Sequence, residues 1–257
     1  MNAPDDQTDI LRIACPECQC RIELDTNEVP PFSVYTCPEC SSQFPVPLPF
    51  GDFLLEQPLG RSKIFTAYRS IDLALEREVV VKILSNELAQ EANVKSYFQD
   101  IARKCAALNA ANVLFTYKTG ESEGQPYLVS EYMSEGSLQD RMDAAEGQLS
   151  ISEALEIASQ VADALRQALE QADLTHDDLK PSNVLFSDAG TAKLGDFGMS
   201  WLASAASVSE KGSAGTLHPC YASPELLTTG KQDCRGDIFS LGALLCHMLS
   251  GRPPFTR

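Results

Sequence analysis

Two identical tetrapeptides near the start of the chain carry thiols at metal-ligand spacing. The sequence CPEC occurs at residues 15–18 and again at residues 37–40, with 18 residues between the two copies. Paired CxxC segments at this separation match the ligand spacing of tetrahedral zinc sites. The segment between them has too few apolar residues to fold alone, so bound metal would have to supply the folding free energy. The sequence therefore predicts a zinc ribbon whose ligands are Cys15, Cys18, Cys37 and Cys40.

The other five of the nine cysteines have no metal-ligand spacing. Cys20 is interpreted as a spectator of the ribbon. The remaining four are interpreted as small apolar filler residues: Cys105, Cys220, Cys234 and Cys246. A pair of disulfides is the alternative to zinc, but it needs an oxidising compartment that nothing else in the sequence indicates. Four thiolates leave no open coordination position, which argues against a zinc-dependent enzyme.

The composition limits the classes of partner. The chain has 257 residues, of which 44% are hydrophobic, and a formal net charge of -16. This charge repels nucleic acid and anionic membrane surfaces, so neither is expected as a partner. The first ten residues show no secretory signal, and the longest apolar run, residues 238–249, is shorter than the roughly 20 residues of a membrane-spanning helix. We therefore expect a cytoplasmic protein without a membrane segment.

A second group of chemically active side chains lies in the middle of the chain. The segment LTHDDLKPSNVLF, residues 174–186, places two adjacent aspartates, a lysine and an asparagine within eight positions. A second such segment, AKLGDFGMS, follows at residues 192–200. Apolar residues on both sides of the first segment indicate that a buried core holds its polar groups in place.

Strands and then helices surround these polar segments. β-branched and aliphatic runs predict strands at residues 53–59, 77–85 and 125–133. Apolar periodicity predicts a helix at residues 94–108 and a longer one from about Ser150. The expected apolar face of the first helix comprises Val94, Phe98, Ile101, Ala102, Cys105 and Leu108. That of the second comprises Ile151, Leu155, Ala158, Ala162, Leu165 and Leu169.

HDDLKPSN and DFG together resemble the catalytic loop and the metal-binding loop of protein kinases, with the bacterial serine/threonine class as the nearest match. GTLHPCYASPE and GDIFSLG resemble two further motifs of that family, so the likeness covers residues 51–257. It implies an α+β, bilobal kinase fold with a small β-rich N-lobe and a helical C-lobe, preceded by the zinc ribbon. The expected segments are the ribbon at 1–43, a proline-rich linker at 44–50, the N-lobe and hinge at 51–133, and the C-lobe at 134–257.

The resemblance also implies roles for the polar residues in phosphoryl transfer, which depends on positioning and on cations at the phosphate oxygens. Asp178 would be the catalytic base, and Lys180 would reach the γ-phosphate of ATP. Asn183 and Asp196 would hold Mg²⁺, which prefers oxygen ligands. Lys82 would contact the α- and β-phosphates. The other expected nucleotide-site residues are Gly60 in the flap, Ser130 as the gatekeeper, and Glu131 and Met133, whose main-chain groups would hold adenine.

Taken alone, two of these residues also have ordinary structural interpretations. Lys82 fits an ion-paired or partly buried strand lysine, and Asp178 fits a helix or turn cap. The whole set at family spacing favours the kinase site.

The expected flap departs from the family pattern. In residues 59–68 only Gly60 matches the family's glycines, and Ser62 and Phe65 occupy the second and third glycine positions. Glycines let backbone amides approach phosphate closely, so Phe65 should make the flap bulkier and nucleotide binding weaker.

Two further departures concern charge. Ile101 stands where the family has the glutamate that pairs with the strand lysine, so Lys82 is expected to pair with another group, Asp196. Asp177 replaces an arginine that, in many family members, binds a phosphorylated activation loop. This replacement predicts that loop phosphorylation is not the on-switch. Candidate phosphorylation sites are nevertheless present at Ser200, Ser204, Ser207, Ser209, Ser213 and Thr216.

Two functions remain open. The first is an ATP-dependent serine/threonine protein kinase that transfers the γ-phosphate of Mg-ATP to hydroxyls of protein substrates. The five catalytic polar residues favour it. The second is a pseudokinase, a nucleotide-binding or scaffolding signalling module with little or no turnover. The altered flap, Ile101 and an expected C-terminal truncation at Arg257 favour the second.

Overall fold

The computed structural model separates into two compact units. The first comprises Met1–Arg61 with Thr66–Val81, and the second comprises Ser62–Phe65 with Lys82–Arg257. The residues that the structure describes are 10–62, 64–199, 202 and 218–255. The candidate phosphorylation sites Ser200, Ser204, Ser207, Ser209, Ser213 and Thr216 lie outside them.

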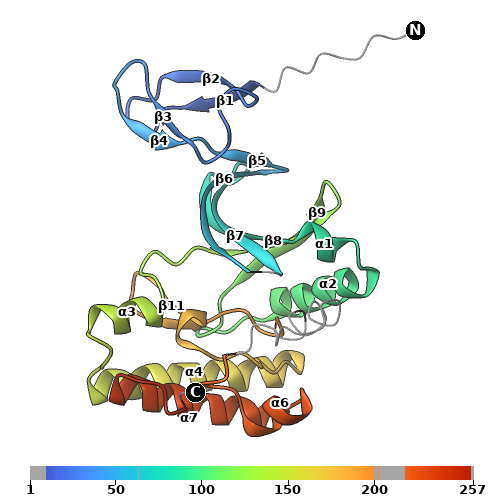
Figure 1. Cartoon of the computed structure of the whole chain (residues 1–257), viewed down its shortest axis with the longest axis vertical. Helices are drawn as coiled ribbons and strands as arrows, with labels where there is room; N and C mark the ends of the chain where they lie inside the picture. The colour runs from blue at the N-terminus through green and yellow to red at the C-terminus, as the bar shows by residue number, and fades with distance from the viewer. Residues whose placement is uncertain (1–9, 63, 200–201, 203–217, 256–257) are drawn as a thin grey trace. The chain divides into compact units, whose positions relative to one another are not determined.

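The first unit begins with two short antiparallel hairpins (Figure 1). In one, β1 (Ile10–Ala14) pairs with β2 (Arg21–Asp25). In the other, β3 (Val34–Thr36) pairs with β4 (Gln43–Pro45). Their side chains form a small core of Leu11, Cys15, Ile22, Leu24, Cys37, Phe44 and Val46.

Each CPEC sequence forms the turn of its hairpin, and the two turns are built alike. The amide of Cys15 donates to the carbonyl of Cys20 at 2.9 Å, and the amide of Cys37 donates to the carbonyl of Ser42 at 2.9 Å. The residue after each CPEC, Gln19 or Ser41, has a left-handed φ of 59° or 61°. These tight turns direct the two thiols of each hairpin to the same side.

Four further strands follow β4, and only two residues separate β4 from the first of them. They are β5 (Leu48–Phe50), β6 (Phe53–Arg61), β7 (Phe65–Asp72) and β8 (Arg77–Leu84), in the order β5-β6-β7-β8. Residues 44–50, expected as a linker, thus contain all of β5.

Side chains join the hairpins to these strands inside the first unit. Leu54 of β6 packs against the hairpin core. The ring of Phe32 stacks on the ring of Tyr68 in β7, with centroids 5.6 Å apart and an interplanar angle of 14°. The hairpins and the strands therefore share one packed body.

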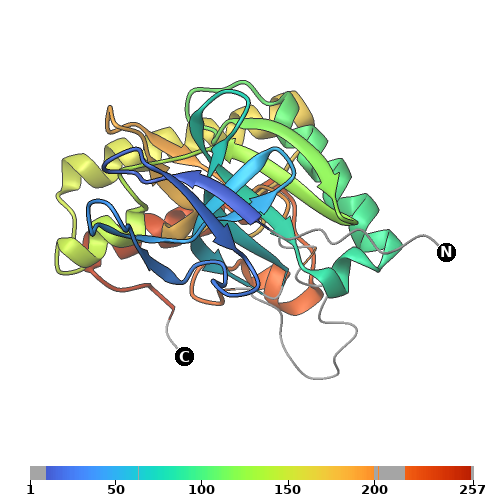
Figure 2. The same cartoon turned by 90° about the horizontal axis from the view of Figure 1, so that it is seen from above.

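The second unit continues from the end of β8 with α1 (Asn86–Ala89) and α2 (Ala92–Ala107). An antiparallel pair follows, β9 (Thr116–Ser122) and β10 (Gln125–Glu131). α2 lies beside this pair (Figure 2). The predicted apolar face of α2 is confirmed, because Val94, Phe98, Ile101, Ala102, Cys105 and Leu108 are all buried.

The rest of the second unit is mainly helical. α3 (Leu138–Ala144) and α4 (Ile151–Ala172) precede the short 3-10 helix η1 (Pro181–Asn183). β11 (Val184–Phe186) pairs with β12 (Ala192–Leu194), and α6 (Pro224–Thr229) and α7 (Cys234–Ser250) follow. α4 and α7 pack side by side (Figure 1). Among the described residues, no helix combines the length and the apolarity that crossing a membrane requires.

The predicted apolar face of α4 is only partly right: Ala158 and Leu165 are buried, but the other four residues of the predicted face are not. The helix begins where expected, and the Ser150 hydroxyl accepts from the Glu153 amide at 3.3 Å. Ile151 and Leu155, however, are 70% and 53% exposed. The buried side chains are Ala154, Ile157, Ala158, Val161, Ala164, Leu165 and Ala168. Apolar residues occur on more than one face of α4. The face with most alanines is the buried one, because small side chains let α7 and β12 approach the helix closely.

Candidate active site and metal centre

An acid in α7 anchors the polar segment 174–186. The amide of His176 donates to Asp237 Oδ2 at 2.8 Å, and the amide of Asp177 donates to Asp237 Oδ1 at 3.0 Å. Asp237 is only 3% exposed, and burial raises the pKa of its carboxyl. No role for Asp237 was predicted from the sequence. The signal that could have identified it is an acidic residue inside an otherwise apolar helix.

His176 links this segment to the second polar segment. Its ring is fully buried and lies 4.9 Å from the ring of Phe197, between centroids. Nε2 lies 2.8 Å from the carbonyl oxygen of Gly195, which can only accept, so Nε2 carries the proton. Nδ1 then accepts from the amide of Asp178 at 3.3 Å. His176 therefore fixes Asp178 relative to the backbone beside Asp196.

Asp178, Lys180 and Asn183 lie close together. Lys180 Nζ donates to Asp178 Oδ2 at 2.5 Å and lies 3.2 Å from Nδ1 of His218. Asn183 Nδ2 donates to the carbonyl of Asp178 at 2.9 Å. The amide of Gly195 donates to the carbonyl of Asn183 at 2.9 Å, which holds the two polar segments side by side.

Lys82 forms an ion pair with Asp196, as expected from the absence of the family's glutamate. The side chains are 12% and 24% exposed. Burial alone would raise the pKa of Asp196, but the adjacent ammonium of Lys82 more than offsets it and keeps this pKa below its usual range. Ile101 lies against Gly198, where an added Cβ would be 2.9 Å from the Ile101 Cδ1. Ile101 therefore makes an aliphatic contact with the loop at Gly198, where the family's glutamate would make an ion pair with the strand lysine.

The hinge residues are held by hydrogen bonds. Glu131 Oε1 accepts from the Phe115 amide and from Lys193 Nζ, each at 2.7 Å, and the Glu131 amide donates to the Phe115 carbonyl at 3.0 Å. Met133 is buried.

Ser130, the expected gatekeeper, lies in β10 next to Glu131 of the expected hinge. It is 1% exposed, and its hydroxyl has no hydrogen-bond partner among the described residues. It lines a small cavity of about 20 Å³ together with Lys82, Cys105, Thr116, Leu128 and Asp196.

The flap residues fall in both units. Gly60 lies in β6 of the first unit, opposite Ala67 of β7. In the second unit, the Ser62 hydroxyl accepts from the amides of Ile64 and Phe65, each at 3.1 Å. Lys82 Nζ lies 5.2 Å from the centroid of the Phe65 ring. Two amides of the flap tip are thus already bound by a side chain of the same turn.

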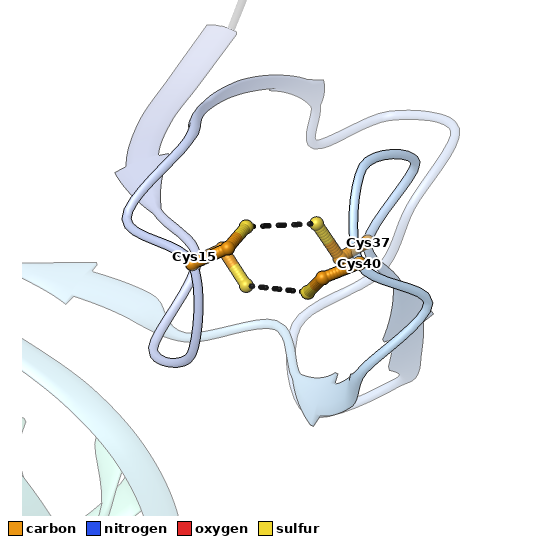
Figure 3. Close-up of side chains that lie close together, drawn as sticks. Cys15, Cys37 and Cys40 are labelled. Atoms are coloured by element: carbon orange, nitrogen blue, oxygen red, sulfur yellow. Dashed lines mark hydrogen bonds between the residues drawn. The ribbon is translucent and has the colours of Figure 1, made fainter.

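The four predicted zinc ligands form a compact sulfur cluster in the first unit, and Figure 3 shows Cys15 facing Cys37 and Cys40. All four Sγ atoms lie within 4.8 Å of one another. The Cys15–Cys40 and Cys18–Cys37 contacts measure 3.6 and 3.7 Å. A tetrahedral site with Zn–S bonds of about 2.3 Å needs sulfurs about 3.8 Å apart, so the residues present fit this metal.

The cysteines are thiols. All nine are free, so the disulfide alternative is not observed. Hydrogen bonds from the Cys18 amide and the Ser42 hydroxyl lower the pKa of the Cys15 thiol to about 6, which favours the thiolate that a metal ion binds.

Removing the anchor in α7 is expected to destabilise the catalytic segment. Asp237→Ala leaves one buried amide, of His176, and one partly buried amide, of Asp177, without their acceptor, which should lower the free energy of unfolding by about 3 kcal/mol. Urea denaturation followed by circular dichroism measures the change. Asp233→Ala, which alters an exposed acid near the start of the same helix, is the control and should cost only about 1 kcal/mol, because it removes a cap. Equal losses in the two variants would contradict the anchoring role of Asp237.

The chain is similar in sequence to known protein kinases. The protein kinase domain model matches residues 53–257. The chain is 31% identical over 209 residues to a probable serine/threonine-protein kinase, pknA2, of Bifidobacterium longum, covering 80% of this chain and 27% of that protein. It is 32% identical over 205 residues to the serine/threonine-protein kinase PknL of Mycobacterium tuberculosis, covering 79% and 50% of the two chains. The chain thus spans half or less of the length of these curated relatives.

The structure is also similar to a solved kinase-domain structure. The crystal structure of the Mycobacterium tuberculosis PknI kinase domain aligns with a TM-score of 0.64 at 26% identity, covering 82% of this chain and 78% of that one. The β-rich beginning and helical remainder predicted from the sequence are those of this fold. The chain belongs to the protein kinase domain family, alongside bacterial serine/threonine-protein kinases.

Proposed function

We propose that the chain is an ATP-dependent serine/threonine protein kinase that transfers the γ-phosphate of Mg-ATP to hydroxyls of protein substrates. The observation that carries this proposal is the connected set of side chains in the second unit. Asp178, Lys180 and Asn183 are joined by hydrogen bonds, and the Gly195–Asn183 backbone bond places them beside the Lys82–Asp196 pair. Phosphoryl transfer needs this combination of carboxylates, an amide and ammonium groups.

Each residue would have one task. Asn183 and Asp196 would hold Mg²⁺, which offsets charge on the phosphate oxygens when bound. Asp178 would orient the substrate hydroxyl and accept its proton. Lys180 would move from Asp178 to the γ-phosphate, and Lys82 would leave Asp196 for the α- and β-phosphates. The main-chain groups of Glu131 and Met133 would hold adenine.

A pseudokinase is the second candidate, and the flap favours it. The Ser62 hydroxyl already occupies the amides of Ile64 and Phe65, and the Phe65 ring lies against Lys82 Nζ. Both contacts compete with phosphate oxygens for the groups that would bind them. This function predicts nucleotide-dependent stabilisation without transfer of phosphate.

The hairpin cluster is proposed as a structural zinc site formed by Cys15, Cys18, Cys37 and Cys40. Its support is the spacing of the four sulfurs. Nine free thiols suit a reducing compartment, so we place the protein in the cytoplasm. The net charge of -16 makes protein substrates, rather than nucleic acid, the expected macromolecular partners.

Nucleotide binding can be tested separately from turnover. Magnesium and ATP at about 100 times the dissociation constant should stabilise the wild-type chain by about 2.7 kcal/mol, measured as a rise in melting temperature. Asp196→Asn should abolish this shift, because the variant loses both the metal ligand and the charge that holds Lys82. Asp188→Asn, an exposed carboxylate, is the control and should retain the shift. A magnesium-dependent shift that survives in Asp196→Asn would contradict the proposed metal ligand.

A further inference from the structure

Cys20, interpreted from the sequence as a spectator, lies in contact with the thiol cluster. Its Sγ is 3.4 Å from the Sγ of Cys37, which is shorter than the 3.6 and 3.7 Å contacts between the proposed ligands. The carbonyl of Cys20 also accepts from the Cys15 amide at 2.9 Å, so the first turn fixes this residue. A fifth sulfur therefore lies beside a site that needs only four.

The two sulfurs differ in their access to solvent. Cys37 is 1% exposed and belongs to the hairpin core, whereas Cys20 is partly exposed. Cys18 and Cys40 are exposed as well, but both would be bound to zinc, so Cys20 is the solvent-accessible sulfur of this cluster that would carry no metal. Cys37 is the nearest sulfur that can react with its oxidised form. A disulfide has a sulfur separation of about 2.0 Å, so the pair must approach by about 1.4 Å, a movement that side-chain rotation can supply.

We propose that Cys20 is a peroxide-sensitive modification site, at which oxidation joins Cys20 to Cys37 and releases the zinc ion. This inference rests on the proposed zinc site. Once Cys37 is in a disulfide it no longer supplies a thiolate, and three ligands remain. Because the hairpins depend on metal for their folding free energy, loss of one ligand also loosens the ribbon.

The reaction balances with peroxide as the oxidant. Cys20 loses its proton to water, and its sulfur attacks one oxygen of hydrogen peroxide. The O–O bond breaks, and Cys20 becomes a sulfenic acid. The leaving hydroxide takes up a proton and becomes water. The Cys37 thiolate then attacks the Cys20 sulfur. The S–S bond forms, the S–O bond breaks, and the hydroxide leaves as a second water after taking up a proton. The two sulfurs together lose two electrons, and hydrogen peroxide gains them.

The experiment uses the full chain loaded with one equivalent of zinc, with the zinc content measured before oxidation. Hydrogen peroxide is added, released zinc is followed with a chromogenic chelator, and the cysteines are mapped by alkylation and peptide mass spectrometry. The wild type should release zinc together with a Cys20–Cys37 cross-link, and a thiol reductant should restore binding. Cys20→Ser and Cys20→Ala should release zinc about tenfold more slowly, because no second sulfur is held as close to Cys37. Cys234→Ser, which changes an exposed thiol in α7, should behave as the wild type.

The outcomes separate this inference from the zinc site on which it rests. Release at the wild-type rate in both Cys20 variants, or release without the cross-link, overturns the role of Cys20 while the metal site stands. A wild-type chain that holds no zinc before peroxide is added overturns the metal site and the inference together.

Discussion

Asp178→Asn is expected to lower the turnover of phosphoryl transfer by about a hundredfold to ten-thousandfold, the range that a positioned general base contributes. The amide cannot accept the proton of the substrate hydroxyl, and it forfeits the ion pair with Lys180. The backbone contacts that hold the position, from His176 and Asn183, do not use the carboxylate and should persist. Affinity for ATP, measured by thermal shift, should therefore change much less than turnover. Transfer of labelled γ-phosphate to a generic basic protein measures the loss.

A second aspartate provides the control for Asp178. Asp173 caps the end of α4 with a left-handed φ of 50°, a conformation that asparagine adopts readily. Asp173→Asn should keep wild-type turnover. Equal incorporation of label by the wild type and Asp178→Asn would remove the enzyme and leave the pseudokinase, provided that ATP still stabilises both.

Cys37→Ser should abolish metal binding and unfold the hairpins. Structural zinc sites of this kind contribute apparent binding free energies of about 10–16 kcal/mol at neutral pH, which exceeds what so small an apolar core can supply. The wild type should carry about one equivalent of zinc per chain, and the variant should carry almost none. Metal analysis after dialysis measures the content, and limited proteolysis should cut the variant between β1 and β4 where the wild type resists.

The matched control for Cys37→Ser changes an exposed thiol far from the cluster in sequence. Cys246→Ser in α7 should keep both the zinc and the resistance to proteolysis. Full metal retention in Cys37→Ser would refute the proposed ligand set. Metal loss with unchanged protease resistance would show instead that the hairpins fold without zinc.

Short-range patterns predicted two of the contacts between polar or sulfur-bearing side chains. The two CPEC turns needed only local spacing, and the four sulfurs do converge. The pairing of Lys82 with Asp196 followed from one missing glutamate, although 113 residues separate the two positions. Such inferences succeed because a charge that enters a core must find a counter-charge.

Contacts set by tertiary packing were harder to predict. The apolar face of α4 was only partly right because periodicity does not say which of two apolar stripes meets α7. The contacts of Asp237 and Cys20 were not predicted, for a related reason. Each residue contacts a partner distant in sequence, and the pattern around neither residue shows which backbone amide or sulfur it will meet.

The shared body of hairpins and strands affects how the kinase domain can be isolated. A fragment that starts at residue 51 removes β5 and leaves the adjacent edge of β6 with unsatisfied backbone groups. The same fragment lacks the hairpin core that packs against Leu54, and it lacks Phe32, whose ring stacks on Tyr68. An open strand edge beside uncovered apolar surface promotes self-association. Trimmed preparations should therefore precipitate or form aggregates, and a soluble product needs the whole amino-terminal region.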